Sequence, residues 1–351
     1  MVEKLKVSVI GSGNWGSCIA RICAENTASS DMFEKDIRMW VFEELVNGRK
    51  LTEIINEQHE NIKYLPNIKL PTNLIAIPDV VEAAKDANIL VFVLPHQFVY
   101  KVCESLKGVL STNCRAISLI KGLDLRDNEL ALFSEEIERI LDIPCAALSG
   151  ANIASEVAEK HFGEATVACR DIEKEGPIYV ALFNTNYFDI RVIGDWRGLQ
   201  VCGALKNVVA VASGIVDGLR LGNNTKAAVI RQGLLEMRRF GKTFFGGVHT
   251  ETFFESCGVA DLITTCAGGR NRRVTEAFVL TGKPIDELEK EMLNGQKLQG
   301  TITAAEIYEF LSSHNMTREF PLFTIVYRII YEKAPPSSLI ENLRTHQSFD
   351  K

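Results

Sequence analysis

The sequence predicts an α/β protein in two parts, a doubly wound parallel sheet followed by an all-α domain. Near the N-terminus, a β-branched run leads into a glycine-rich turn and then into an apolar helix. Similar apolar runs alternate with helical segments as far as Ile193, which is typical of a sheet covered by helices on both faces. Beyond Asp195 the strand candidates stop. We therefore predict one domain over residues 1–194 and a helical one over 195–351.

The composition excludes some partners and favours one compartment. A formal net charge of -6 and a pI near 5.7 argue against a broad surface for nucleic acid or anionic membrane. The nine cysteines form no C-x-x-C pair, which fits core thiols in a reducing compartment. The opening MVEKLK leads straight into the first strand and leaves no room for a signal peptide, so we expect a cytoplasmic protein.

The first strand and helix frame a dinucleotide fingerprint. Gly11, Gly13 and Gly16 have the spacing G-x-G-x-x-G between the strand run of residues 7–10 and a helix that opens at Cys18. Gly11 allows a tight turn, Gly13 a close approach of pyrophosphate, and Gly16 close packing of helix on strand. The free N–H groups at the helix start then face the phosphates. This pattern predicts a Rossmann-like domain that binds a dinucleotide.

Two acids follow the second predicted strand, Asp36–Phe42. Glu43 and Glu44 lie where an acid bonds the ribose hydroxyls and repels a 2′-phosphate, which favours NAD over NADP. They come later than the usual spacing of about 20 residues, which a longer helix or loop explains. The alternatives are that both glutamates are solvated, or that Arg49 with Lys50 receives a phosphate.

The central strands should deliver polar residues to one edge of the sheet. The run Asn88–Leu94 is apolar on both faces and belongs in the middle of a parallel sheet. Ligands bind outside the carboxyl ends of such strands, so Pro95–Phe98, Lys121 and Ser149–Asn152 are expected at the cofactor crevice. The other predicted elements of this domain are helices at 51–64 and 80–87, and strands at 74–77, 116–120, 146–148 and within 166–193.

The helix predicted over Asp195–Gly218 is apolar and rich in small residues, so it should be buried. Its segment Val201–Val216 is too short to cross a bilayer, and Lys206 with Asn207 interrupts it, so no membrane insertion is expected. A buried lysine tends to lose its proton and needs a partner or a function. The alternative without a catalytic function is that Lys206 reaches the surface or pairs with a glutamate.

A second polar stretch suggests an anion site. If Asp261–Thr265 is helical, then Asp261, Thr264 and Thr265 share one face. Arg270 and Asn271 follow two glycines at the start of the next helix, where a guanidinium beside free N–H groups suits a phosphate.

The remaining polar segments do not predict one specific function. Arg272 and Arg273 are expected to be solvated. Leu293–Gly300 has a glycine near or at each end and suits a mobile flap over a ligand, or equally an ordinary connection between helices. The six histidines, His346 among them, show no ligand spacing, so no metal site is expected.

The motifs, taken in order from about Val7 to Tyr331, resemble those of NAD-dependent glycerol-3-phosphate dehydrogenase of the eukaryotic cytosolic type. The segments that carry the resemblance are GSGNWGS, WVFEE, LPHQF, SLIKG, SGANIASEVA, CGALKNVVAVASG, NNTKAAVIRQGL, ESCGVADLITTC, GGRNRR and LNGQKLQG. The chain departs from the family at Ala267, Asn223, the pair Arg238-Arg239 and the tail beyond Tyr331, and none of these removes an expected catalytic residue.

The resemblance implies reversible hydride transfer between NADH and dihydroxyacetone phosphate, giving sn-glycerol 3-phosphate, in a homodimer. It makes the first domain the dinucleotide-binding part and the second the substrate-binding and catalytic part. It implies Lys206, Lys121 and Asp261 as catalytic residues. It implies substrate contacts by Lys121, Asn207, Asp261, Thr265, Arg270 and Asn271. It implies cofactor contacts by Gly11, Ser12, Gly13, Asn14, Trp15, Gly16, Phe42, Phe98, Ala154, Arg270, Lys297 and Gln299.

The chemistry of ketone reduction agrees with these roles. Negative charge develops on the ketone oxygen, so the site needs a group that releases a proton there; protonated Lys206 can do this, with Lys121 stabilising the charge. Asp261 and Thr265 would orient the lysine. Two rival functions remain at this point, a 3-hydroxy-acid dehydrogenase whose anion site holds a carboxylate, and a non-catalytic NAD(H)-sensing regulatory protein.

Overall fold

The computed structural model describes residues 3–126 and 129–345, so His346 lies outside the described residues. The chain forms two compact units, one of Met1–Lys121 with Leu132–Trp196 and the other of Gly122–Ala131 with Arg197–Lys351. The division after Trp196 lies two residues from the predicted boundary. The short segment 122–131, predicted as part of the first domain, clusters instead with the helical unit.

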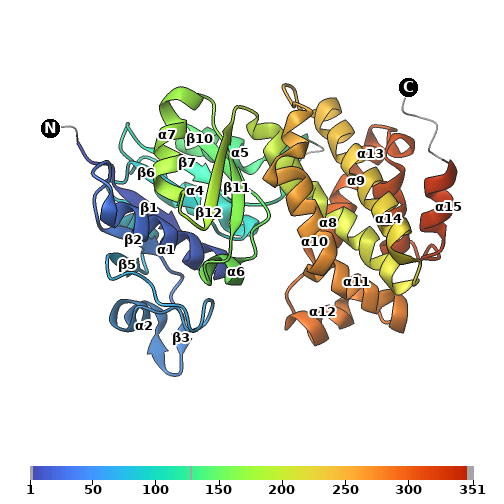
Figure 1. Ribbon diagram of the computed structural model, residues 1–351, viewed down its shortest axis with the longest axis horizontal. Helices are drawn as coiled ribbons and strands as arrows, with labels where there is room; N and C mark the ends of the chain where they lie inside the picture. Colours follow the sequence, from blue (N-terminus) through green and yellow to red (C-terminus); the bar gives the residue numbers. More distant parts are fainter. Residues whose placement is uncertain (1–2, 127–128, 346–351) are drawn as a thin grey trace. The chain divides into compact units, whose positions relative to one another are not determined.

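The first unit is built on one eight-stranded sheet in the order β12-β11-β10-β7-β6-β1-β2-β5 (Figure 1). Its strands are β1 (Val7–Ile10), β2 (Ile37–Trp40), β5 (Leu74–Ile77), β6 (Ile89–Phe92), β7 (Arg115–Ser118), β10 (Cys145–Ser149), β11 (Gly163–Ala168) and β12 (Phe188–Ile193). All pairs are parallel except β10 with β11. The connection between these two strands contains the five-residue helix α6 (Ala154–Ala158).

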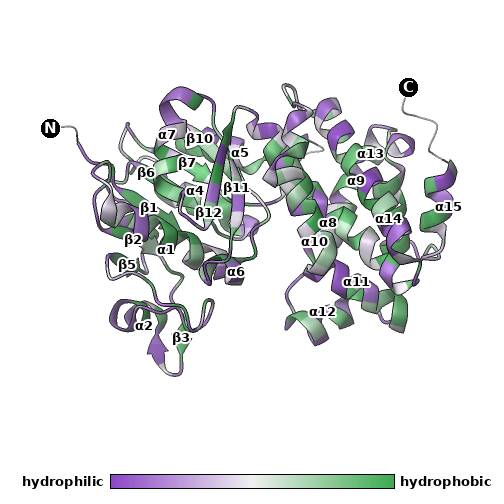
Figure 2. Cartoon of the chain, in the orientation of Figure 1, coloured by the Kyte–Doolittle hydropathy of each residue, from purple (hydrophilic) through white to green (hydrophobic). Residues whose placement is uncertain are grey.

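Helices cover both faces of this sheet, so the predicted doubly wound α/β class is confirmed. On one face lie α1 (Asn14–Ser29), α6 and α7 (Ile172–Phe183); on the other lie α3 (Val80–Ala84), α4 (Val99–Leu106) and α5 (Phe133–Leu141). Each face has its own apolar cluster. All four residues of β6 are buried, as expected for a strand apolar on both faces. The strands at the centre of the sheet are mostly green in Figure 2.

The predicted helix at 51–64 is shorter in the structure. Helix α2 (Leu51–Gln58) ends because His59 is left-handed, with φ 50°, and its N–H bonds the Ile55 carbonyl. The chain then turns so that the buried side chain of Asn61 reaches the glycine-rich turn. Two short strands, β3 (Leu45–Val46) and β4 (Arg49–Lys50), precede the helix and were not predicted.

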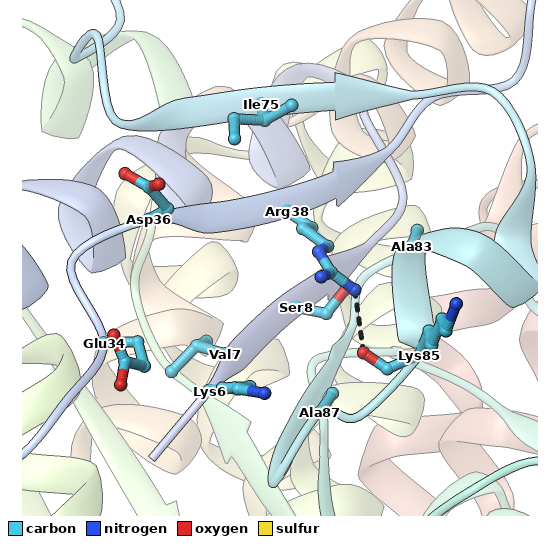
Figure 3. Close-up of a pocket in the computed structure, with 10 residues that line it drawn as sticks. All are labelled: Lys6, Val7, Ser8, Glu34, Asp36, Arg38, Ile75, Ala83, Lys85 and Ala87. Atoms are coloured by element: carbon cyan, nitrogen blue, oxygen red, sulfur yellow. Dashed lines mark hydrogen bonds between the residues drawn. The ribbon is translucent and has the colours of Figure 1, made fainter. Parts of the chain in front are cut away.

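A cavity of about 220 Å³ lies at the amino-terminal ends of β1 and β2, the ends opposite the glycine-rich turn (Figure 3). Arg38 in its wall donates to the carbonyls of Glu82 (3.3 Å) and Lys85 (2.8 Å), where α3 ends. The guanidinium therefore caps the end of α3, which ends at Ala84, three residues before its predicted end. Ligands of such sheets bind at the other end of the strands.

The second unit is helical. Its helices are α8 (Trp196–Gly218), α9 (Gly222–Phe244), α10 (Asp261–Gly268), α11 (Arg270–Thr281), α12 (Ile285–Leu293), α13 (Gln299–Ser313), α14 (Pro321–Tyr331) and α15 (Ser338–Thr345). The predicted all-helical domain is confirmed with one addition, the paired strands β8 (Leu123–Arg126) and β9 (Glu129–Leu132), of which β8 contacts α13.

Helix α8 is the buried centre of this unit. The predicted segment Val201–Val216 is too short to cross a bilayer, but the helix that contains it has 23 residues and is the one described helix long and apolar enough to do so. The whole apolar window is nevertheless buried inside the protein, because neighbouring helices pack closely on it. A Cβ at Gly214 would lie 2.3 Å from the Arg272 carbonyl oxygen. The helix is therefore apolar all round because it is a core helix.

The contact between β8 and α13 includes an acid with an unusual pKa. Burial, and then the charges of Asp124 and Glu309, raise the pKa of Glu306 to about 7. Its buried Oε2 has no hydrogen-bond partner in the structure. An unfolded glutamate titrates near 4.5, so between pH 4.5 and 7 the folded state binds more protons, and the free energy of unfolding falls as the pH rises through this window.

We expect Glu306→Gln, which cannot ionise, to remove most of this pH dependence. The two proteins should have the same Tm at pH 5, whereas at pH 8 the variant should melt about 2–4 °C higher. Thermal unfolding followed by circular dichroism from pH 5 to 8 measures this difference. Parallel curves for the two proteins would show that Glu306 is not the group responsible.

Candidate active site

The glycine-rich turn has the geometry that its spacing predicts. Gly11 has φ +126°, and a Cβ there would lie 2.4 Å from the Val93 carbonyl oxygen. A Cβ at Gly16 would lie 2.5 Å from the Gly11 oxygen. At Gly13, by contrast, a Cβ would meet nothing within 4 Å, so the backbone there is open. Two glycines thus serve packing, and the third leaves room for a ligand.

The start of α1 can receive an anion. Gly13 is its N-cap and supplies no side chain to bond the first N–H groups of the helix. The turn before it is held by Asn61, which donates from Nδ2 to the Ser12 carbonyl at 2.9 Å and to Ser17 Oγ at 2.9 Å. Sequence reasoning missed Asn61, because it is separated from Ser12 by 49 residues and lies in no motif.

The side chains of two predicted cofactor residues, Trp15 and Asn14, contact other parts of the protein. The Trp15 ring packs edge-on against Phe188, with centroids 6.1 Å apart. Asn14 donates from Nδ2 to the Tyr64 carbonyl at 2.8 Å. Since both residues stand in the first turn of α1, their backbone N–H groups are what they can offer to a phosphate.

Two aromatic rings are exposed after the strands on either side of β1. Phe42, just beyond β2, is 67% exposed, and Phe98, just beyond β6, is 47% exposed. Large apolar rings left in solvent at the carboxyl ends of parallel strands suit stacking against the flat rings of a nucleotide. Ala154, the third residue expected to line the dinucleotide, is nearly buried at the start of α6.

The acids after β2 are held within their loop. Glu43 accepts from Thr52 Oγ1 at 2.6 Å, while Glu44 pairs with Lys63 and accepts from the Tyr64 hydroxyl at 2.7 Å. The alternative of two solvated glutamates is therefore wrong. Arg49, the other candidate for a phosphate, pairs with Glu57 at 2.5 Å.

Lys121 lies three residues beyond the carboxyl end of β7, the strand next to β10 in the sheet. Its Nζ donates to the Gly150 carbonyl at 3.1 Å, so the ammonium is held at the carboxyl end of β10. This is the edge of the sheet predicted for it.

In the second unit, a buried lysine lies between two helices. Lys206 of α8 is 6% exposed, and its Nζ lies 2.5 Å from Asp261 Oδ1 and 2.8 Å from Thr265 Oγ1 of α10. The adjacent carboxylate stabilises the ammonium form, which the desolvation of burial opposes. The alternatives of a surface-reaching lysine or a glutamate partner are wrong. The geometry places the lysine amine against a carboxylate and a hydroxyl in a buried position.

One residue further along α8, Asn207 joins a second polar contact. Asn271 donates from Nδ2 to Asn207 Oδ1 at 3.0 Å and accepts from the Gly300 N–H at 2.8 Å. A Cβ at Gly300 would lie 2.5 Å from the Asn207 carbonyl oxygen and 2.8 Å from Asn271 Oδ1. Only glycine lets the start of α13 approach this pair.

Arg270 begins α11 directly after Gly269. No side chain caps this helix, and its first N–H groups lie next to the exposed guanidinium. The guanidinium donates from Nη1 to Gln296 Oε1 at 2.7 Å. The combination suits a phosphate, and sequence reasoning had not singled out Gln296.

The next arginine is not solvated as predicted. Arg272 pairs with Asp217 of α8 at 2.5 Å, and Lys226 of α9 pairs with the same carboxylate oxygen at 2.7 Å. These contacts lower the pKa of Asp217 against the effect of its burial. The cluster ties α8, α9 and α11 together.

The stretch Leu293–Gly300 connects α12 to α13. Lys297 pairs with the buried Glu289 at 2.8 Å. Gln299 opens α13 and donates to Thr303 Oγ1 at 3.3 Å.

The second unit thus brings together the predicted catalytic residue Lys206 and most of the predicted substrate residues: Asn207, Asp261, Thr265 and Asn271. The first unit holds the glycine turn, the two exposed rings and Lys121. Over residues 3–126 and 129–345, no three His, Cys, Asp or Glu side chains are grouped as a metal site. All nine cysteines lie within the described residues; they form no disulfide and are buried, as predicted for core thiols.

Comparison with known proteins agrees with this arrangement. Residues 6–175 match the N-terminal and residues 195–341 the C-terminal part of NAD-dependent glycerol-3-phosphate dehydrogenase. The cytoplasmic glycerol-3-phosphate dehydrogenase (NAD+) of Drosophila kanekoi is 55% identical over 347 residues, 99% of this chain and 96% of its own. The human one is 56% identical over 342 residues, 97% and 98% of the two chains.

A solved structure gives the same result. Glycerol-3-phosphate dehydrogenase from Saccharomyces cerevisiae is 48% identical and superposes with a TM-score of 0.93, covering 97% of this chain and 99% of its own. Identity at this level over nearly the whole of each chain identifies the family. The chain belongs to the NAD-dependent glycerol-3-phosphate dehydrogenases.

Proposed function

We propose that this protein is a cytoplasmic NAD-dependent glycerol-3-phosphate dehydrogenase, which reduces dihydroxyacetone phosphate reversibly to sn-glycerol 3-phosphate. The observation that carries the proposal is the buried Lys206 ammonium, 2.5 Å from Asp261 and 2.8 Å from Thr265. A protein that only senses a nucleotide has no chemical use for a desolvated lysine held in this way. The relatives' shared name and cytoplasmic designation support the same conclusion.

The residues of the first unit fit NAD. The open backbone at Gly13 and the uncapped start of α1 would hold the pyrophosphate, and the Phe42 and Phe98 rings, with Ala154, would line the nucleotide. Arg270, Lys297 and Gln299 are proposed as further contacts. Bound NADH supplies the hydride for the carbonyl carbon.

Lys206 is the proposed proton donor. As negative charge develops on the ketone oxygen, one proton moves from Nζ to that oxygen, and the ketone becomes an alcohol. Asp261 and Thr265 keep the amine protonated and aimed. Lys121 is proposed to stabilise the charge on the oxygen. In the reverse direction neutral Lys206 takes the proton back.

The substrate phosphate is assigned to the start of α11. Arg270 would pair with it, and the first N–H groups of the helix, that of Asn271 included, would donate to it. The side-chain amide of Asn271 is already hydrogen-bonded to Asn207 and to the Gly300 N–H. This side chain therefore serves mainly to hold α8, α11 and the start of α13 together. We accordingly assign residues 1–194 to dinucleotide binding and 195–351 to substrate binding and catalysis.

The test is NADH oxidation by the purified protein with dihydroxyacetone phosphate, unphosphorylated dihydroxyacetone or a β-keto acid. The proposal requires the phosphorylated ketone to be strongly preferred, because Arg270 contributes binding energy only when the phosphate is present. Equal rates with and without the phosphate would refute it. Preference for the β-keto acid would favour a 3-hydroxy-acid dehydrogenase, and NADH binding without turnover would favour a sensor.

The contact of Gly300 with Asn271 gives a prediction for this site. We expect Gly300→Ala to raise the KM for dihydroxyacetone phosphate by about 10–100-fold, because the new methyl group would displace Asn207 and Asn271. Steady-state kinetics measure the change. Gly295→Ala is the control for glycine loss in the same segment, where a Cβ meets nothing within 4 Å, although φ +80° adds strain there. A KM for Gly300→Ala no higher than that of the control would contradict the prediction.

We also propose that the protein is a homodimer, as the resemblance to the family implies. Sedimentation equilibrium should then give about twice the chain mass of 39.0 kDa. A single-chain mass at assay concentrations would refute this.

A further inference from the structure

The loop between α12 and α13, Asn294–Leu298, is folded around one acid. The backbone carbonyl of Glu289 accepts from the Gly295 N–H at 3.0 Å. Its Oε1 accepts from the Leu298 N–H at 2.8 Å, and its Oε2 from Lys297 Nζ at 2.8 Å. The Asn294 N–H also donates to the Glu289 carbonyl, so one residue of α12 bonds four residues of the loop.

The two ends of this ion pair differ in exposure. The Glu289 side chain is 5% exposed, whereas that of Lys297 is 68% exposed. Without the Lys297 ammonium, the buried carboxylate would keep its hydrogen bond from the Leu298 N–H but lose its opposite charge. Leaving a buried charge uncompensated in this way costs free energy. Leu298 itself is buried against Val274 and Leu288. The Glu289 carboxylate thus binds Leu298, which is fixed at the end of the loop, and Lys297, whose side chain is exposed to solvent.

We propose that Glu289 is a positioning residue, which holds the Asn294–Leu298 loop against α12 and keeps the Lys297 ammonium there until an anionic ligand takes it. This rests on the proposed function in one respect, that Lys297 contacts the cofactor. When Lys297 moves to the ligand, Glu289 keeps its bond to Leu298, so the end of the loop stays in place. The loop then closes from an ordered conformation, and less conformational entropy is lost on closure.

A purely structural role for Glu289 is the competing explanation. Its bond to the Leu298 N–H lies at the N-cap of α13, and a carboxylate at a helix start stabilises the helix wherever it occurs. The two explanations differ in whether the effect of Glu289 passes through Lys297.

The first experiment uses the protein without substrate or cofactor. Glu289→Gln keeps an acceptor for Leu298 but removes the charge that holds Lys297. We expect trypsin to cleave after Lys297 about five- to tenfold faster in this variant, with faster amide exchange over the loop. Glu291→Gln is the matched control, because Glu291 is on the same helix but pairs with Lys283 at 2.5 Å. Equal cleavage of the variant and the control would overturn the proposal.

The second experiment is a double-mutant cycle on kcat/KM for dihydroxyacetone phosphate. Glu289→Gln should lower kcat/KM about fivefold in the wild-type background and less than twofold in a Lys297→Ala background, because both changes act through one side chain. Equal losses in the two backgrounds would leave Glu289 as a structural cap only. Absence of turnover in the wild-type protein would refute the proposed function, while the cleavage experiment would still decide the role of Glu289 in the loop.

Discussion

Replacing Lys206 by alanine is expected to lower kcat for dihydroxyacetone phosphate by about 10²–10⁴-fold while NADH still binds. The reason is that the variant lacks the ammonium held by Asp261 and Thr265, so the ketone oxygen must take its proton from water. Steady-state turnover measures the loss, and NADH fluorescence titration measures binding. Normal turnover would show that another group is the acid.

The control for this prediction is Lys226→Ala. Lys226 pairs with Asp217 at 2.7 Å in the same unit, so the control also breaks a lysine–aspartate pair. Loss of Lys206 leaves Asp261 buried without its cation, which costs about 3–5 kcal/mol of stability. Lys206→Ala combined with Asp261→Ala removes both charges and should fold while remaining equally inactive. Recovery of turnover in this double variant would also contradict the assignment.

Replacing Arg270 by alanine is expected to lower kcat/KM for dihydroxyacetone phosphate by about 10–10²-fold, with both a higher KM and a lower kcat. The guanidinium is the charged group at the start of α11 and contacts Gln296 of the neighbouring loop. Binding energy at the phosphate, remote from the reacting carbon, helps to position that carbon, so its loss affects turnover as well as affinity.

Arg273→Ala is the matched control for this change. Arg273 is exposed on the same helix, so its loss changes the net charge equally. Rates with unphosphorylated dihydroxyacetone should be unchanged in Arg270→Ala, because that substrate has no phosphate to bind. An equal loss with both substrates would indicate a distorted site, and an unchanged kcat/KM would refute the anion-site assignment.

The nucleotide-binding part of the fold could be predicted because its signals are local. A strand that is apolar on both faces, such as β6, has to lie inside a sheet whatever follows it in the chain. The steric needs of Gly11 and Gly16 are likewise set by their immediate surroundings, and the structure shows the close approaches that they permit. The errors here are the unpredicted short strands β3 and β4 and the ends of two helices. At Gln58 a left-handed residue follows the helix, and at Ala84 an arginine of β2 binds the carbonyls at the helix end.

The catalytic unit could be predicted in part. Two charged residues stand out from the sequence pattern: Lys206, within an apolar helix, and Arg270, at the start of a helix. A buried charge and an uncapped helix start both cost free energy, so each suggests a function. Their partners do not stand out. The residue pattern alone allowed a glutamate for Lys206 and water for Arg272. Asp261 was expected beside Lys206 only through the family resemblance, and the structure shows that pair together with the pairing of Arg272 with Asp217.

The sequence by itself therefore determined the fold class, the dinucleotide turn and the identity of the charged residues that must have a function. The tertiary structure alone decided which groups meet: Asn61 at the Ser12 carbonyl, Glu289 at Lys297, and segment 122–131 beside the helices. Periodicity and turn chemistry act over a few residues. Lys206 and Asp261, by contrast, are 55 residues apart in the chain, and only the packing of α8 on α10 brings them within hydrogen-bonding distance.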